Sequence, residues 1–238
     1  MNNILCTICM RGNSKEVPNK NIKKINKKPL LFYTIDQAKK SKMFSNIVVS
    51  SDSIQILKLA SKYKVDACFK RPIKLAQDKS PKIPAIRHLF LKSENFFNKQ
   101  YDIIVDLDVT SPLRTSLDII NSIKKIIKDK AENLISVSPS RRNPYFNMLE
   151  LKNNKIDLVK KTKKKIYGRQ GTPKVYDMNA SIYIWKRKTL IKSNNLCNKK
   201  TSLFLMPQNR SLDIDSIFDS KIVEYIMKKK INKIKKYA

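Results

Sequence analysis

Glycine and histidine are scarce in this sequence, which has 3 glycines and 1 histidine among 238 residues. The glycine-rich signatures of P-loop and dinucleotide-binding proteins are both absent, so neither way of holding phosphate applies. We interpret His88 as a packed residue rather than a catalyst. No segment approaches the roughly 18 apolar residues of a membrane span. The N-terminus does not resemble a signal peptide, so we expect a cytoplasmic protein without membrane partners.

Cysteines are also few, and two of them are close together. Cys6 and Cys9 have the C-x-x-C spacing of metal or redox sites. They fall within an apolar run that reads as a strand, where residues three apart face opposite sides. The sequence has no second pair of this kind. We therefore interpret these cysteines as buried structural thiols.

Acidic residues are outnumbered by basic ones, 19 against 51, which gives a formal net charge of +32. Such an excess is typical of nucleic-acid-binding proteins, and this remains an alternative of another class. The excess is mostly lysine and is spread along the chain, and we find no recognition element. We therefore expect no specific nucleic-acid partner, although the positive field should attract anionic ligands.

The chain reads as a single domain spanning 1–238, and its hydrophobic content of 41% is enough for a sizeable core. Apolar runs alternate with amphipathic helical stretches, which predicts a mostly parallel α/β sheet covered by helices on both faces. In the helix predicted at 116–130, we expect Leu117, Ile120, Ile123 and Ile127 to share one face. The predicted strands are 4–10, 46–52, 65–69, 101–108, 133–139, 180–185 and 202–207.

The alternation of strands and helices stops after residue 140 and resumes near residue 180. Residues 143–161 read as two strands around an asparagine-rich turn, and a polar stretch follows them. We therefore predict that 140–178 is an insertion within the domain and that it carries its own β-structure.

The first predicted strand is followed by a loop rich in hydrogen-bond donors, RGNSK. Gly12 permits a tight turn, and backbone N–H groups, Ser14 and Lys15 can then face a phosphate. Ligands of open α/β sheets bind beyond the carboxyl ends of the strands, which is where this loop should lie. An ordinary polar connection explains this pattern equally well when the loop is taken alone.

Asp106 and Asp108 end another predicted strand and share one of its faces, because they are two residues apart. A helix N-terminus capped by Ser111 or Thr115 also fits this segment. The two interpretations are compatible, since a cap and a site both fall at the end of a strand.

Asp213 and Asp215 also flank a single apolar residue, in SLDIDS. In an extended chain both carboxylates point the same way, which suits one hard divalent cation such as Mg²⁺. The alternative is a surface pair with a helix N-cap at Asp215 or Ser216. Arg169 and Gln170, in GRQGTP, offer a planar guanidinium and an amide for a carboxylate or phosphate.

Five segments occur along the chain in this order: RGNSKEVPNKNI, KRPIKLAQD, TSPLRT, RQGTP with YDMNASIYIW, and RSLDIDS. As an ordered set they indicate a family more specifically than any one segment does. This series resembles the motifs of the N-acylneuraminate cytidylyltransferases, also called CMP-sialic acid synthetases. The resemblance implies a Rossmann-like α/β fold, a dimerisation element at 140–178 and a homodimer. It also implies CTP and a nine-carbon 2-keto sugar acid as substrates, with Mg²⁺ as cofactor.

The resemblance also implies roles for individual residues. It assigns nucleotide binding to Arg11, Ser14, Lys15, Lys20, Asn21 and Arg71. It assigns metal binding to Asp213 and Asp215. It assigns binding of the sugar acid to Asp108, Arg169, Gln170 and Asn179. We expect Arg11 and Lys15 to be catalytic, because they would offset charge on the triphosphate and the leaving pyrophosphate. We expect Asp213 to be catalytic because it would help to hold Mg²⁺.

The sequence departs from the family pattern at several positions. Asn13 and Glu16 stand where glycines are usual, so an inactive homologue is an alternative. Asp108 and Val109 replace Gln and Pro, and Lys82 stands where sialic acid members often have Ser. The segments DLDVTSPLR, RRNPYFNMLEL and VYDMNASIYIW most resemble the branch that activates legionaminic acids. We therefore predict N,N′-diacetyllegionaminic acid as the sugar acid, with N-acetylneuraminic acid as the alternative.

Overall fold

The computed structural model describes residues 2–12, 17–162 and 167–229. Its strands are β1 (Ile4–Cys9), β2 (Lys24–Ile25), β3 (Lys28–Pro29), β4 (Asn46–Ser51), β5 (Ala67–Lys70), β6 (Ile103–Leu107), β7 (Asn133–Pro139), β8 (Leu149–Lys152), β9 (Lys155–Leu158), β10 (Tyr176–Lys186) and β11 (Thr201–Leu205). Its α-helices are α1 (Leu30–Ser41), α2 (Ile54–Lys62), α3 (Lys82–Phe97), α4 (Ser116–Lys128), α5 (Arg187–Lys192) and α6 (Ile217–Lys228). Short 3₁₀ turns are η1 (Lys20–Ile22), η2 (Ile73–Leu75), η3 (Arg169–Gly171) and η4 (Gln208–Arg210). The predicted alternation of strands and helices is confirmed.

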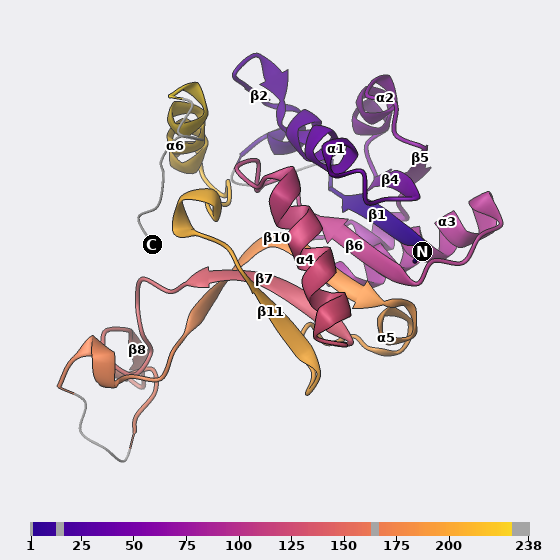
Figure 1. The fold of residues 1–238 in the computed structure, drawn as a ribbon. Coiled ribbons are helices and arrows are strands. Elements are labelled where there is room, and N and C mark those ends of the chain that lie inside the picture. The colour runs from indigo at the N-terminus through magenta and orange to yellow at the C-terminus, as the bar shows by residue number, and fades with distance from the viewer. Residues whose placement is uncertain (1, 13–16, 163–166, 230–238) are drawn as a thin grey trace.

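Seven strands form the central sheet, in the order β11-β7-β10-β6-β1-β4-β5 (Figure 1). Only β10 among these strands runs antiparallel to its neighbours, β6 and β7. The remaining neighbours pair in parallel. The mostly parallel sheet that the sequence predicts is therefore confirmed, and the carboxyl ends of β1, β4, β5 and β6 meet at one edge.

The two faces of the sheet bury separate apolar clusters, because side chains alternate along each strand. From β1, Ile4, Cys6 and Ile8 join the cluster that also contains residues of α1, α2 and α4. Leu5 joins the opposite cluster, with residues of α3 and α5. Cys9 packs against that second cluster, and all four cysteines are free. The two thiols lie on opposite faces as predicted, but only Cys6 is buried, since Cys9 is partly exposed.

Helix α4 begins with a capping box, in which Thr115 accepts a hydrogen bond from the backbone N–H of Asp118. Thr115 is therefore the cap, as one of the two sequence alternatives predicts. The predicted apolar face is only partly right, since Ile123 is buried but Leu117 and Ile127 are 60% and 46% exposed. The stripe that packs on the sheet contains Ile119, Ile123 and Ile126 instead. Isoleucines occupy both stripes, so periodicity alone does not determine which one is buried.

Residues 140–162 and 167–175 form an arm that extends away from the sheet and helices (Figure 1). Within it, β8 and β9 form the predicted antiparallel hairpin. Asn153 and Asn154 join these strands with positive φ angles of 51° and 58°, which asparagine adopts readily. Strand β10 begins at Tyr176, so the predicted boundary at 178 falls inside this strand. Within the described ranges, no helix is long and apolar enough to cross a membrane.

Candidate active site

A hollow of about 300 Å³ lies at the carboxyl ends of β1, β5 and β6, and we call it the carboxyl-edge hollow. Parallel strands bring these ends together although they are far apart in the sequence. Seven of the residues predicted from the sequence line it: Arg11, Lys20, Asn21, Arg71, Asp108, Asp213 and Asp215. Ser14 and Lys15 lie outside the described residues.

The chain after β1 is held tightly against the loop that follows β4. The backbone N–H of Gly12 donates to Asp52 Oδ1 at 2.9 Å. A Cβ atom at position 12 would lie only 2.8 Å from Ser53 Cβ. Only glycine therefore lets the backbone come this close to Ser53. The φ angle of Gly12 is not positive, so glycine is not needed here for a tight turn, as the sequence had suggested. Asn21 Nδ2 donates to the carbonyl of Arg11 at 2.8 Å and fixes the same segment.

Three cations contribute to the hollow from different elements. Arg11 donates to Asp78 Oδ1 at 3.1 Å and to the carbonyl of Gln77 at 3.2 Å. Lys20 Nζ reaches across to the loop before α6. Arg71, which follows β5, is buried with 5% of its surface exposed and donates to the carbonyl of Ser50 at 3.2 Å. The guanidinium of Arg71 is therefore preorganised, because its position is fixed by the backbone of β4.

The two aspartates of SLDIDS line the hollow in different environments. Lys20 Nζ donates to the carbonyl of Ile214 at 2.7 Å and to Asp215 Oδ1 at 3.2 Å. Asp213 Oδ1 is buried and has no hydrogen-bond partner within the described part of the chain. Burial, and then the nearby carboxylate of Asp108, raise the pKa of Asp213 to about 6. Ser216 caps α6 through a capping box, as one sequence alternative predicts.

These two aspartates fit the requirements of a hard divalent cation in part. Asp213 Oδ1 is a buried carboxylate oxygen without a partner, which a cation would satisfy. Asp215 presents a second, more exposed carboxylate from the same loop. No group of three or more histidine, cysteine or acidic residues suited to a metal occurs in the described ranges. Mg²⁺ tolerates such a sparse set, because it commonly keeps waters and substrate phosphates as ligands.

A charge cluster in which Asp106 is buried and Lys82 and Asp108 are half-buried forms the wall of the hollow beside β6. Lys82 Nζ lies 2.7 Å from Asp108 Oδ2 and 3.2 Å from Asp106 Oδ2. The same ammonium lies 4.4 Å from the centre of the Tyr183 ring. Asp108 Oδ1 accepts hydrogen bonds from the backbone N–H and the hydroxyl of Thr110. Both oxygens of Asp108, a predicted sugar-acid residue, therefore already have partners within the protein.

The pKa values of this cluster follow from burial and pairing. Burial raises the pKa of Asp106 above its usual value, and Lys82 only partly offsets this effect. Burial also acts on Asp108, but Lys82 and the bonds from Thr110 outweigh it, so its pKa is lowered. Burial lowers the pKa of Lys82, but the facing Asp108 and Asp106 reverse this, so its pKa is raised. Lys82 thus favours the charged form of both carboxyl groups, whereas Asp108 disfavours charge on Asp106.

Asn179 and Gln170, two further predicted residues, do not line the hollow. Asn179 is buried; its Oδ1 accepts from the Ser136 hydroxyl at 2.7 Å, and its Nδ2 donates to Ser211 Oγ at 3.0 Å. It therefore holds the loop that carries Asp213 rather than lining the hollow. Gln170 is exposed in η3 on the arm, and the backbone of Arg169 belongs to the same turn.

Comparisons with known proteins agree along nearly the whole chain. The family model described as cytidylyltransferase matches residues 5–236. Post-translational flagellin modification protein B of Campylobacter coli is 47% identical over 97% of both chains. CMP-N,N′-diacetyllegionaminic acid synthase of Campylobacter jejuni subsp. jejuni is 46% identical over 95% of this chain and 96% of that protein. Pseudaminic acid cytidylyltransferase, also from Campylobacter jejuni subsp. jejuni, is 29% identical over 94% of this chain and 96% of its own length.

The fold also resembles that of solved structures. CMP:2-keto-3-deoxy-manno-octonic acid synthetase, in complex with CTP, superposes with a TM-score of 0.69 over 96% of this chain and 99% of the other. At 11% sequence identity this likeness concerns the fold alone, and it confirms the predicted Rossmann-like architecture. The family model, the two relatives above 45% identity and this fold all lead to one assignment: the chain belongs to the cytidylyltransferase family of nucleotidyltransferases.

Proposed function

We propose that the protein transfers the cytidylyl group of CTP to a nine-carbon 2-keto sugar acid, with N,N′-diacetyllegionaminic acid favoured as the acceptor. The observation that carries this proposal is the carboxyl-edge hollow, where Arg11, Lys20 and Arg71 face Asp213 and Asp215. Cations suit a triphosphate, and a carboxylate pair suits the cation that accompanies it. The acceptor is supported by the name of the relative that is 46% identical.

In the proposed reaction, the anomeric hydroxyl of the sugar acid attacks the α-phosphorus of CTP, and the bond to the β-phosphate breaks to release pyrophosphate. Arg11 and Lys20 offset the charge on the phosphates, and the buried Arg71 orients the nucleotide. The proton of the hydroxyl passes to a carboxylate oxygen of the aspartate pair. Mg²⁺, held by Asp213 and Asp215, supplies further charge neutralisation when bound.

The cations are already paired in the absence of substrate, and this affects how CTP binds. Arg11 contacts Asp78, and Lys20 contacts Asp215. The triphosphate therefore replaces existing carboxylate contacts rather than binding to bare charges. The exchange leaves Asp215 available for the cation at the moment when the phosphates arrive. Nucleotide and cation are thus expected to bind cooperatively.

The arm supports the proposal of a homodimer. Leu149, Leu151 and Ile156 of its hairpin are 66%, 71% and 72% exposed, although they are large and apolar. Apolar side chains gathered on an extended element are typical of a surface that another chain covers. We propose a second copy of this chain as that partner. Light scattering should give twice the mass of the chain, and the mass of one chain would contradict this.

The acceptor choice can be tested by direct competition. Equal concentrations of N,N′-diacetyllegionaminic, pseudaminic and N-acetylneuraminic acids are supplied with CTP and Mg²⁺. We expect kcat/KM for the legionaminic acid to exceed that for N-acetylneuraminic acid at least tenfold, which is about 1.4 kcal/mol. The reason is Asp108 Oδ2, which accepts a hydrogen bond from Lys82 and retains a second lone pair that can accept from a second substrate amide.

The products must be separated by chromatography, because diacetylated legionaminic and pseudaminic acids are stereoisomers of equal mass. A pool dominated by CMP-pseudaminate or CMP-N-acetylneuraminate would overturn the choice of acceptor and leave the cytidylyl transfer standing. A complete lack of CMP-sugar would overturn the proposed activity itself.

A further inference from the structure

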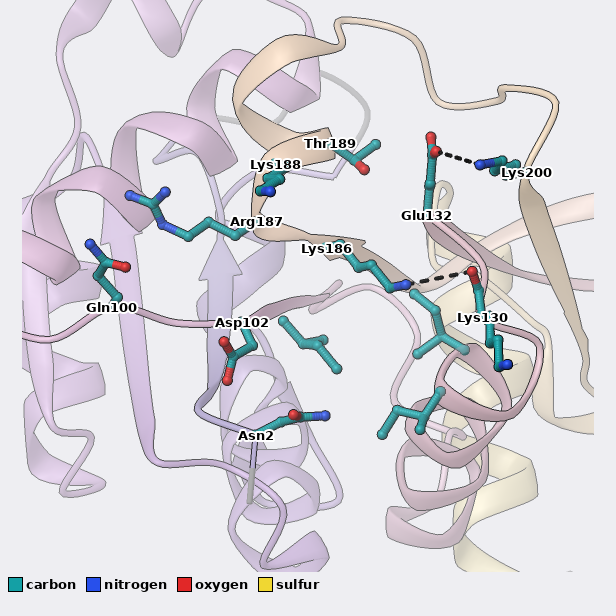
Figure 2. A pocket seen from close by; sticks show the side chains of 13 residues that line it. Asn2, Gln100, Asp102, Lys130, Glu132, Lys186, Arg187, Lys188, Thr189 and Lys200 are labelled. Carbon is teal, nitrogen blue, oxygen red and sulfur yellow. Dashed lines mark hydrogen bonds and ion pairs between the residues drawn. The ribbon is translucent and has the colours of Figure 1, made fainter.

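A second hollow of about 710 Å³ lies at the opposite edge of the sheet, and we call it the amino-edge hollow (Figure 2). It is formed where β1 and β6 begin, where α4 ends and where β10 runs into α5. It is more than twice as large as the carboxyl-edge hollow. Its volume falls within the range of about 300–1,000 Å³ that is usual for small-molecule sites.

Isoleucines form the floor of this hollow. Ile103 and Ile126 belong to the buried core and are 4% and 0% exposed. Ile127 lies beside them and is 46% exposed, because it is on the side of α4 that faces away from the core. Ile127 therefore provides most of the accessible apolar surface of this floor, and an apolar or flat group that covers it removes that surface from water.

Lysines gather around this floor from three separate segments. Lys130 follows α4, Lys186 ends β10, Lys188 lies in α5 and Lys200 precedes β11. Figure 2 shows Lys186 extending across the hollow, where its Nζ lies 3.5 Å from the carbonyl of Lys130. Lys200 pairs with Glu132 at 3.5 Å. Within the described ranges, Lys130, Lys186 and Lys188 have no ion pair.

The acidic side chains at the hollow offset only part of the charge of these three ammonium groups, because Asp102 contributes one carboxylate and Glu132 pairs with Lys200. Asp102 Oδ2 accepts a hydrogen bond from the backbone N–H of Asn3 at 2.8 Å. Arg187, which points away from Lys130 in Figure 2, makes two bonds to Glu94, at 2.9 Å and 2.8 Å. The arginine is therefore part of the wall, and the uncompensated charge is concentrated in the lysines.

We propose that the amino-edge hollow binds a phosphorylated small molecule with an apolar or flat portion, namely a nucleotide or a sugar phosphate, at a site separate from that of CTP. The three ammonium groups match a ligand with two or three negative charges, and their mutual repulsion falls when it binds. The isoleucine floor matches a base or the apolar face of a sugar. A linear polyanion would use the lysines but leave this floor uncovered.

The test measures binding by calorimetry, with ATP and glucose 6-phosphate as probes and with inorganic pyrophosphate as a probe of charge alone. A double variant, Lys186→Gln with Lys188→Gln, removes two of the three ammonium groups. We expect its dissociation constant for the tighter probe to rise roughly tenfold or more, since charge-assisted contacts are lost. The matched control is Lys58→Gln with Lys62→Gln, which removes two exposed lysines from α2.

The control variant should bind the probe as the wild type does, and so should Arg71→Ala, which alters only the carboxyl-edge hollow. Loss of binding in Arg71→Ala together with unchanged binding in the Lys186→Gln, Lys188→Gln variant would overturn the proposal. So would a wild type that shows no saturable binding of either organic probe at millimolar concentration. If pyrophosphate binds as tightly as ATP or glucose 6-phosphate does, the isoleucine floor does not contribute to binding. None of these outcomes depends on whether cytidylyl transfer is observed.

Discussion

Replacing Asp213 with asparagine will lower kcat/KM for cytidylyl transfer by about 10³-fold or more and will at the same time raise the melting temperature. The activity falls because asparagine cannot supply the second negative charge of the aspartate pair. The stability rises because Asp213 Oδ1 is buried without a partner and its pKa is raised to about 6. A raised carboxyl pKa means that folding disfavours the charged form, at a cost of about 1–3 kcal/mol near neutral pH.

The pH dependence of this gain follows from the same pKa. Between the unfolded pKa of about 3.9 and the folded value of about 6, the wild type loses stability as the pH rises. The gain from Asp213→Asn should therefore be full at pH 7 and vanish below about pH 4, where both states are neutral. Thermal melts without divalent cations, recorded at several pH values, measure it.

Asp215→Asn is the matched control, because the Asp215 side chain is 67% exposed. We expect it to lose activity without a comparable gain in melting temperature. If Asp213→Asn keeps half of the wild-type activity, the assignment of the pair to the reaction is wrong. If it melts at a lower temperature than the wild type, the buried charge is not a source of strain.

Lys82→Met should destabilise the folded protein by about 3–5 kcal/mol, the usual cost of removing one partner from a buried ion pair. Without Lys82, Asp106 and Asp108 face each other with no cation between them. Asp106 is only 1% exposed, so water does not replace the lost ammonium. Urea denaturation at pH 7 measures the change, which should narrow at low pH, where both carboxyl groups become neutral.

Two further variants separate the buried cluster from a general effect of lysine. Lys40→Met removes an exposed lysine that pairs with Asp36 at 2.7 Å, and it should cost no more than about 0.5 kcal/mol. Adding Asp106→Asn and Asp108→Asn to Lys82→Met should recover much of the lost stability, because the cluster then holds no carboxylate that lacks its cation. A Lys82→Met protein as stable as the wild type would show that the cluster does not hold this wall together.

Most of the fold could be predicted from the sequence, because strands, helices and turns are indicated by patterns of neighbouring residues. Strands such as Ile4–Cys9 are short apolar runs, and the helices between them have a clear period. Turn chemistry was equally informative, since Asn153 and Asn154 join the arm hairpin as expected. Which face of α4 is buried could not be predicted, because Ile119 and Ile126 compete with a second apolar stripe that shares Ile123.

The candidate site was predictable where motifs sit at the carboxyl ends of strands. Arg11, Arg71 and Asp108 follow three different strands, and the parallel sheet brings them to one hollow. Lys82 was not predictable as the centre of a charge cluster, because it is one lysine among many and its partners lie more than twenty residues away. Asn179 likewise acts through a distant contact with Ser211, which no local pattern in the sequence indicates.

The most direct measurement follows the fate of the CTP phosphates in single reactions with N,N′-diacetyllegionaminic acid. CTP is labelled with ³²P at the α position in one sample and at the γ position in another. We predict that the α label enters a CMP-sugar and the γ label enters pyrophosphate in equal amounts, and that both events require the acid and stop when EDTA removes Mg²⁺. Release of the α label as free CMP or CDP, independent of any sugar acid, would contradict the proposed transfer.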